Sequence, residues 1–469
     1  MFLTKAFLKK GGVLPLMMVI ILLGVAACGG AAPASQTEPE PAEQEAQAAE
    51  AQEEAPAEQA AEASAAEAQE VTLTFWTFVD AHTDFLQKQV ERFNAEHPEV
   101  KLKLEPTTIA YQEMHDKLLI ALQSGTGAPD LVDIEIAKFG TFVRGDIQLH
   151  DLTPLVENTK EDVVQERLAP YQLGGKQYGV DYHLGAVVMY YNKELLDQAG
   201  VDIDSIKTWD DYIEAGKQVK EQTGAWMATV ETTDKWTVSP IMQQNGGGVY
   251  DQDGNLILDG QANVEALQLL SDMFHVHQIL GVAPGGTHHT PDYYAMMNEG
   301  DKTASVWMPQ WYMIRFKEHM PDLAGKMVVR PLPAFEEGGI ISTMGGGTGT
   351  AITKQIDPAK LDVAMQFLEF AKLTREAQVR FWTELGFDPY RLDVYDDPEL
   401  KNPDEYFGNE PVMQTIKGML DRLAPEYNGP RYPEAQIQIR EKIAYGLFEE
   451  NTPPAELLKA STDQINAMQ

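Results

Sequence analysis

The sequence predicts an α/β fold with two lobes, and two observations support this. Between residues 71 and 136, strand-like segments alternate with segments in which apolar residues recur at helical spacing. That alternation is typical of a parallel sheet covered by helices. Residues 71–469 also exceed the length at which a single hydrophobic core stops growing, so a second lobe is expected.

The first lobe is expected to begin with alternating strands and helices. The strands are VTLTFWT (71–77), VKLKLEP (100–106) and DLVDIEI (130–136). The helices are DFLQKQVERFNAEHP (84–98) and YQEMHDKLLIALQSG (111–125). Pro98 ends the first helix, while Gly125 and Gly127 end the second. Ligands bind such sheets beyond the carboxyl ends of the strands, which are here residues 77–80, 105–111 and 135–140.

The later part of the chain is richer in helical patterns. Helices are expected over residues 209–222, with Thr208 as the N-cap, over 261–280 and over 433–451. Asp253-Gly254 lies between two apolar runs and predicts a tight hairpin turn. Four tryptophans are assigned to the core: Trp209, Trp226, Trp307 and Trp382.

The first 70 residues predict export and attachment to a membrane. A basic start and an apolar run are followed by small residues before Cys28, the only cysteine of the 469 residues. This is typical of a signal peptide over 1–27 that is cleaved before a lipidated Cys28. The alternatives are an ordinary secreted protein or an uncleaved anchor. Residues 28–70 then form an acidic, Ala/Glu-rich linker that has no Ile, Leu, Val or aromatic residue after residue 30, so the linker should not pack as a core.

Charge and motifs exclude several classes of function. The formal net charge of −36 argues against a nucleic-acid partner, and no thiol follows Cys28. Phosphate-loop, H-E-x-x-H and G-x-S-x-G motifs are missing, and residues 251–260 lack the glycine of a calcium loop. The pairs His275/His277 and His288/His289 do not have the spacing of two ligands on one helical face. We therefore expect no metal and no cofactor. A carboxylate pair suited to glycoside hydrolysis stays open, but nothing singles one out.

Aromatic residues occur where a ligand would bind. Trp76 ends the first strand, Trp236 lies near a helix start, and Trp311 follows a strand. Tyr390 and Arg391 lie in the segment GFDPYR. Flat apolar rings beside charged and amide side chains suit a neutral sugar, whose C–H faces stack while its hydroxyls form hydrogen bonds. Core packing is the alternative role for each tryptophan.

Several stretches together resemble the family 1 extracellular solute-binding proteins of carbohydrate ABC importers, the group of the maltodextrin-binding proteins. They are FNAEHPEVKLKLE, ALQSGTGAPDLVDIE, YGVDYHLGAVVMYYNKELLDQAGVD, KTWDDYIEAGKQV, EGDKTASVWMPQWYM, PLPAFEEGG and MGGGTGTAI. The resemblance implies a bilobal periplasmic-binding-protein-like fold in which the chain crosses between the lobes about three times. It places the N-terminal lobe at 71–184 and 346–388, and the C-terminal lobe at 185–345 and 389–469.

The resemblance also implies site residues. Trp311 matches a tryptophan that stacks on sugar, and Trp236 stands where the family places an aromatic contact. Glu135 and Lys138 fall in a loop that supplies polar contacts. Together with Trp76, Tyr182, His183, Tyr390 and Arg391, these are the expected ligand-binding residues. Gly345, Gly346 and Gly347 are the expected hinge. Asp181 stands where the family usually has proline, a departure that bears on the hinge and on the sugar type.

The expected function is an extracytoplasmic, lipid-anchored receptor that captures a mono- or oligosaccharide and delivers it to the permease of an ABC importer. Such a receptor is expected to be a monomer without enzymatic activity. One alternative is the same fold with a non-sugar solute, such as a polyamine, an iron complex or an anion. Another is a secreted enzyme acting on carbohydrate. The receptor binds stoichiometrically, whereas the enzyme would release product.

Overall fold

The computed structural model describes residues 68–468. The predicted signal peptide, Cys28 and nearly all of the linker lie outside the described residues. Residues 69 and 70, counted in the linker from the sequence, already belong to the first strand, because Gln69 and Glu70 pair with Val100 and Lys101. Over the described range, no helix combines the length and the apolar character needed to cross a bilayer.

The first sheet has the order β12-β3-β1-β2. Its strands are β1 (Gln69–Thr77), β2 (Val100–Thr108), β3 (Leu131–Glu135) and β12 (Thr348–Ile352). β1 is parallel to β2 and β3, as expected from the alternation of strands and helices, whereas β12 joins antiparallel at the edge beside β3. Alternate side chains of β1 from Val71 to Thr77 are buried, so one face of this strand meets the core.

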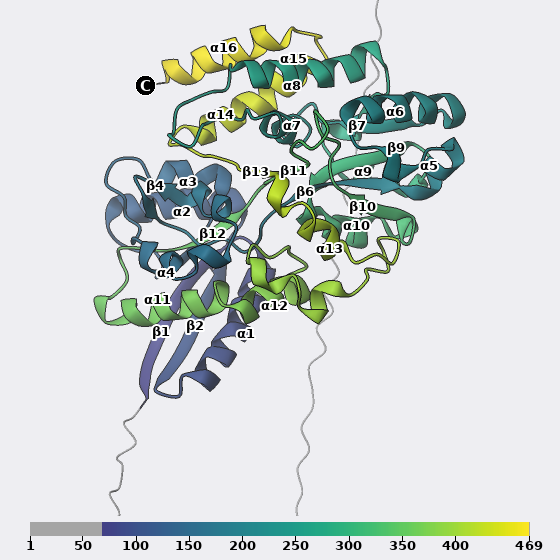
Figure 1. Cartoon of the computed structure of the whole chain (residues 1–469). Helices are drawn as coiled ribbons and strands as arrows, with labels where there is room; N and C mark the ends of the chain where they lie inside the picture. The colour runs from purple at the N-terminus through teal and green to yellow at the C-terminus, as the bar shows by residue number, and fades with distance from the viewer. Residues whose placement is uncertain (1–67, 469) are drawn as a thin grey trace, which may run out of the picture. The chain divides into compact units, whose positions relative to one another are not determined.

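Helices cover this sheet and form the first lobe, at the lower left of Figure 1. They are α1 (Asp80–Glu96), α2 (Tyr111–Ser124), α3 (Ile136–Phe142), α4 (Thr153–Glu157), α11 (Pro358–Lys372) and α12 (Arg375–Leu385). α1 buries Phe85, Leu86, Val90 and Phe93, the residues whose spacing predicted this helix. α11 and α12 come from a distant part of the sequence, and both pack against α1.

The second sheet has the order β10-β6-β9-β7-β8. Its strands are β6 (Val187–Asn192), β7 (Trp226–Val230), β8 (Leu280–Val282), β9 (Thr303–Pro309) and β10 (Met327–Arg330). β9 is parallel to β7 and antiparallel to β6. Every residue of β6 and β9 is buried, as expected for strands at the centre of a sheet that is covered on both faces.

The helices of the second lobe surround this sheet along the top and at the right of Figure 1. They are α5 (Lys193–Ala199), α6 (Trp209–Thr223), α7 (Ser239–Gln244), α8 (Gln261–Ser271), α9 (Pro291–Glu299), α10 (Met313–His319), α13 (Val412–Lys417), α14 (Tyr432–Gln438), α15 (Ala444–Phe448) and α16 (Pro454–Ala467). Short pairs complete the strands: β4 (Gln172–Leu173) with β5 (Lys176–Gln177), and β11 (Ser342–Thr343) with β13 (Leu423–Ala424). Thr208 caps α6 as predicted, through a reciprocal pair with Asp211.

Some local predictions hold and others need correction. The turn at Asp253-Gly254 is confirmed by an antiparallel bridge between Tyr250 and Leu256. Trp209 and Trp307 are buried in the core, whereas Trp226 and Trp382 are only partly buried. The helices expected over 261–280 and 433–451 are interrupted by π-helical turns at Asp272–Val276 and Ile439–Ile443. Apolar periodicity runs through both turns and does not reveal them.

The chain passes between the two lobes in three crossing segments, which are residues 178–186 before β6, residues 344–347 before β12 and residues 386–391 after α12. Asp388 joins the first and the third of them. Its carboxylate accepts hydrogen bonds from the backbone N–H groups of Gly185 (2.9 Å) and Ala186 (2.8 Å). Its own N–H donates to Oε1 of Gln310, 2.9 Å away, at the end of β9. The side chain is fully buried, and burial raises the pKa of Asp388 to about 7. The first and third crossing segments are therefore held together by one side chain.

Arg167 joins the first and second crossing segments. Its guanidinium forms a buried ion pair with Asp181 and donates to the carbonyl oxygens of Leu184 (3.2 Å) and Gly346 (2.9 Å). The other carboxylate oxygen of Asp181 accepts from the backbone N–H of Tyr182, 2.7 Å away. Asp181 stands where the family usually has proline. The aspartate has a physical reason here, because it is the counter-ion of Arg167.

We predict that Gly347→Ala disrupts this junction. A Cβ at position 347 would come closer than 3.0 Å to both the Arg167 guanidinium and the Asp181 carboxylate. We expect a loss of about 3 kcal/mol in the free energy of unfolding, measured by chemical denaturation. Gly338→Ala is the matched control, since Gly338 also has a positive φ of 80° but no atom within 4 Å of the added Cβ. Backbone strain alone should cost about 1 kcal/mol there. Equal losses in the two variants would contradict the steric role of Gly347.

Candidate ligand-binding site

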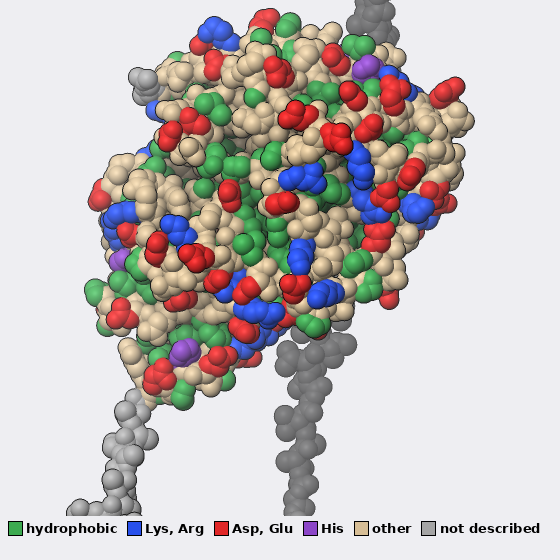
Figure 2. All heavy atoms as spheres, viewed as in Figure 1, with side chains coloured by type: hydrophobic (Ala, Val, Ile, Leu, Met, Phe, Trp, Pro, Cys, Tyr) green, Lys and Arg blue, Asp and Glu red, His purple; other side chains and the backbone are tan. Residues whose placement is uncertain are grey.

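A cavity of about 920 Å³ is lined by both lobes and by the crossing segments. The first lobe contributes Phe78, His82, Tyr111 and Glu135, the second lobe contributes Asp234, Trp236, His289, Trp311 and Arg315, and the crossing segments contribute His183, Gly346, Gly347 and Phe387. In the face shown in Figure 2, hydrophobic side chains gather in the middle of the molecule and charged side chains surround them. The volume lies in the range of small-molecule sites. We refer to this cavity as the cleft.

Two tryptophans form the wall that belongs to the second lobe. Trp236 and Trp311 meet edge to face, with ring centroids 5.3 Å apart and planes inclined by 73°. Nε1 of Trp311 donates to the carbonyl oxygen of Gly345, 3.2 Å away, which ties this ring to the crossing segment. The backbone N–H of Trp236 donates to Oε2 of Glu231 at 2.9 Å. Both rings are partly exposed and lie where the sequence predicts ligand contacts.

The opposite wall comes from the carboxyl ends of the first sheet's strands. Phe78 follows β1 and packs edge to face against Tyr111, with ring centroids 5.2 Å apart. Tyr111 is 38 % exposed, which is unusual for so large an apolar ring in this protein. Aromatic faces therefore stand on both sides of the cleft.

Glu135 places a carboxylate beside the Tyr111 ring. One of its oxygens caps α3 by accepting from the backbone N–H of Ala137 (2.9 Å), and it also accepts from the Tyr111 hydroxyl (2.9 Å). Burial raises the pKa of Glu135. Lys138 is not among the residues that line the cleft, although its ammonium lies 5.6 Å from the centre of the Tyr111 ring, where it donates to Oε1 of Gln112.

His115 holds the backbone of Glu135 in place and requires a neutral ring to do so. Its Nδ1 donates to the carbonyl oxygen of Tyr111 (2.7 Å), while its Nε2 accepts from the Glu135 N–H (3.2 Å). A proton on Nε2 would place two donors face to face. Burial, the largest cause, lowers the pKa of His115 to about 4.

We predict that neutral His115 makes folding sensitive to acid. The unfolded chain has the ordinary pKa near 6.5, so it binds more protons than the folded protein between about pH 6.5 and 4. The stability is present above pH 6.5 and is lost as the pH falls toward 4, by about 3 kcal/mol in full. Denaturation at pH 7.5 and 4.5 should show a smaller acid loss in His115→Phe than in the unmodified protein. Equal acid losses would contradict this role.

Besides Lys138, four further expected ligand contacts lie outside the cleft lining. Tyr182 and Tyr390 are fully buried: the Tyr182 hydroxyl donates to Asp133, and the Tyr390 hydroxyl donates to the carbonyl oxygen of Asp181. Arg391 is paired with Asp162 and Asp393. Trp76 packs against the apolar cluster of the first lobe. The sequence placed these residues near a strand end or a crossing, but their side chains turn into the core or pair at the surface.

Several residues of the cleft were missed from the sequence. His82 and Phe387 lie at its floor, and Arg315 and Arg440 line its second-lobe side. His82 lies soon after the end of β1. Because ligands bind beyond the carboxyl ends of such strands, this position could have indicated from the sequence that His82 lines the site. Arg440 had no such signal, because it belongs to the unforeseen π turn at Ile439–Ile443.

The cleft borders one possible cation site. It consists of Glu231, Asp234 and His289, which each place one possible ligand atom within 4.8 Å of the others. The oxygens of Glu231 are already in use, however. They accept from the backbone N–H groups of Trp236 and His288 and from the Thr287 hydroxyl. Burial, and next to it the nearby Asp234, raises the pKa of Glu231 to about 8. Glu231 is therefore best explained as the support of two loops that border the cleft.

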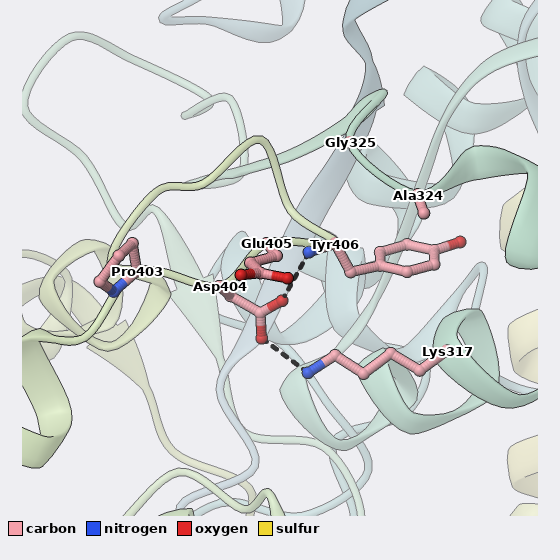
Figure 3. Close-up of a pocket in the computed structure, with 7 residues that line it drawn as sticks. All are labelled: Lys317, Ala324, Gly325, Pro403, Asp404, Glu405 and Tyr406. Atoms are coloured by element: carbon pink, nitrogen blue, oxygen red, sulfur yellow. Dashed lines mark hydrogen bonds and ion pairs between the residues drawn. The ribbon is translucent and has the colours of Figure 1, made fainter.

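A second hollow lies in the second lobe, near the start of β10 (Figure 3). Its main polar groups are paired with one another: Lys317 Nζ donates to Asp404 at 2.7 Å, and Asp404 also accepts from the Tyr406 N–H at 3.1 Å. Only the second lobe lines this hollow, and its one lysine is already paired with Asp404. The cleft between the lobes is the stronger candidate site.

Two α/β lobes joined by crossing segments, with an aromatic cleft between them, define a ligand receptor of the two-lobed class. The model of one family, the bacterial extracellular solute-binding proteins, matches residues 80–378. The chain belongs to this family, and its bilobal fold is also that of solved sugar-binding proteins.

Curated relatives and solved structures are similar over most of the chain. An arabinooligosaccharide-binding protein of Halalkalibacterium halodurans is 44% identical over 84% of this chain and 89% of its own length. An arabinooligosaccharide-binding protein of Bacillus subtilis is 41% identical over 84% of this chain and 91% of its own length. The GacH receptor of Streptomyces glaucescens has a similar fold, with a TM-score of 0.66 and 22% identity over 85% of this chain and 98% of that one.

Proposed function

We propose that this chain is the extracytoplasmic receptor of an ABC importer and that it captures an uncharged oligosaccharide in the cleft. The observation that carries the proposal is the pair of aromatic walls, Trp236 with Trp311 and Phe78 with Tyr111, that face one cavity from different lobes. Pyranose and furanose rings offer C–H faces to such walls. A ligand that touches both walls favours closure, because only the closed state lets both lobes bind it.

The charges in the cleft favour a neutral ligand. Its acidic residues are Glu135, Asp234 and Glu318, and its basic residues are Lys235, Arg315 and Arg440. The strong negative charge of the whole chain is therefore not concentrated in the cleft. A polyamine would need an excess of carboxylates and an anion an excess of cations, so neither fits as well as a sugar.

We further propose that the sugar is an arabino-oligosaccharide. Two relatives that are more than 40% identical to this chain over the aligned residues carry that ligand in their names. By the same reasoning, a lipid on Cys28 tethers the receptor beside a membrane permease, and the receptor acts as a monomer without turnover. A relative from Streptococcus pneumoniae, 24% identical over 57% of this chain, is named as a solute-binding lipoprotein of a maltooligosaccharide ABC transporter.

Thermal denaturation of the full chain against a ligand panel tests this function. The panel holds arabino-oligosaccharides, malto-oligosaccharides, lactose, spermidine, sulfate and citrate. Ligand at about 100 times Kd stabilises a protein by about 2.7 kcal/mol, so the denaturation midpoint should rise by several degrees with arabino-oligosaccharide. Stabilisation by spermidine or by an anion, and by no sugar, would overturn the proposal. Release of arabinose during incubation would instead indicate an enzyme.

A further inference from the structure

Two histidines, His82 and His183, lie on the floor of the cleft, and the ring of Phe387 packs against both of them. His82 belongs to the first turn of α1, and His183 belongs to the first crossing segment. Both side chains pack against Phe387, with ring centroids 6.1 Å and 5.0 Å apart, respectively. Both residues are nearly buried, yet both line the cleft. Each therefore turns only an edge of its ring toward a ligand.

The partner of His82 determines which of its ring nitrogens carries the proton. Nδ1 lies 2.9 Å from Oδ2 of Asp133, a fully buried carboxylate. Burial alone would favour the neutral acid, but the hydrogen bond from His82, the charge of Lys372 and the hydrogen bond from Thr350 lower the pKa of Asp133. An ionised carboxylate only accepts hydrogen bonds, so Nδ1 of His82 must be the donor. In the neutral ring the other nitrogen, Nε2, then carries a lone pair.

The surroundings of His183 determine the opposite tautomer. Among the described residues Nδ1 has no hydrogen-bond partner, and it is sealed from solvent. It lies beside Gly185, where an added Cβ would be 3.0 Å away. Burial lowers the pKa of His183 to about 3, so the ring is neutral. A sealed N–H without an acceptor is rarer and more costly than a sealed lone pair, which leaves the proton on Nε2.

Both Nε2 atoms remain available to a ligand. Within residues 68–468, neither forms a hydrogen bond, and neither is among the sealed, unpaired atoms of the protein. Asp133 is fixed in turn by donors from Thr77 (2.8 Å) and Thr350 (2.6 Å), so His82 cannot turn without breaking a buried network. Tyr182 stacks on the His82 ring with centroids 3.9 Å apart and further limits rotation.

We propose that His82 and His183 form a fixed acceptor–donor pair that recognises hydroxyl groups of the ligand at the floor of the cleft. The lone pair on Nε2 of His82 accepts from one hydroxyl, and the N–H on Nε2 of His183 donates to the same or the adjacent hydroxyl. A hydroxyl does both, whereas an ammonium only donates and a carboxylate only accepts. The pair thus selects an uncharged polyol, and this inference rests on the proposed sugar-binding function.

Nitrogen NMR of the unliganded protein tests the first half of the proposal without any ligand. Long-range proton–nitrogen spectra of the full chain, with histidine labelled by ¹⁵N, report which ring nitrogen is protonated. We expect the Nδ1–H form for His82 and the Nε2–H form for His183 at pH 7.5, with signals assigned through single His→Phe variants. The reverse form at either residue, or a doubly protonated ring at His82, overturns the proposal, whether or not a sugar binds.

Affinities for deoxygenated ligands test the second half. His183→Phe and His82→Phe should each weaken binding of arabinotriose about tenfold, which corresponds to one lost hydrogen bond. An analogue that lacks the recognised hydroxyl should lose affinity for the unmodified protein but lose little further in these variants. His319→Phe is the control, since this exposed ring lies outside the cleft lining. If every deoxy analogue loses as much affinity in the two variants as it does in the unmodified protein, the proposal is overturned. If the unmodified protein binds no sugar at all, the proposed function itself is overturned.

Discussion

Replacement of Arg167 by alanine is expected to destabilise the protein by about 3–5 kcal/mol, because it leaves the buried carboxylate of Asp181 without its counter-ion. The same change removes the hydrogen bonds from the guanidinium to Leu184 and Gly346. The loss should appear as a lower midpoint in urea at pH 7.5, measured on the unliganded chain.

Two further variants separate the buried pair from surface charge. Lys193→Ala removes an exposed pair with Asp197, and it should cost no more than about 0.5 kcal/mol. The double change Arg167→Met with Asp181→Leu removes both buried charges, so it should recover part of the stability lost in Arg167→Ala. An Arg167→Ala protein that unfolds at the same urea concentration as the unmodified protein would contradict the role assigned to this pair.

Replacement of Trp311 by alanine is expected to weaken sugar binding by about 2 kcal/mol, or about 30-fold in Kd. The ring forms half of the second-lobe wall, and its removal also leaves Trp236 without its edge-to-face partner. Because Trp311 is partly exposed, the unliganded protein should stay folded. Isothermal titration calorimetry measures the affinity, and circular dichroism checks the fold.

Trp226→Ala is the matched control for this prediction. Trp226 belongs to the second lobe and is partly buried, but its ring lies under the Lys220 ammonium and away from the cleft. The substitution should lower stability without changing Kd. If Trp311→Ala binds as tightly as the unmodified protein, Trp311 is a packing residue, which is the alternative that its sequence position leaves open.

Local pattern predicted much of the fold. The first three long strands and two long helices follow from periodicity and from breakers such as Gly125, which ends α2 in the left-handed conformation. β12 could not be placed this way, since it joins β3 from more than 200 residues further along the chain. The π turns at Asp272–Val276 and Ile439–Ile443 also left no pattern. Tertiary packing decides such features.

The candidate site was predicted in part. Position beyond a strand end and resemblance to the family pointed to Glu135, Trp236 and Trp311, which line the cleft. Neither source revealed that Tyr182 faces Asp133, because burial depends on partners that are distant in sequence. Lys372 shows the same limit: it is fully buried at the end of α11, and its ammonium donates to the carbonyl oxygen of Val180 at 2.8 Å.

Calorimetric titration of arabinotriose into the full chain, with chromatography of the sugar afterwards, shows whether the protein binds the sugar and leaves it intact. We expect one binding site per chain, a Kd in the micromolar range or tighter, which is at least about 8 kcal/mol of binding free energy, and intact sugar at the end. Absence of binding by arabinotriose and by every other sugar of the panel would contradict this expectation, as would recovery of free arabinose.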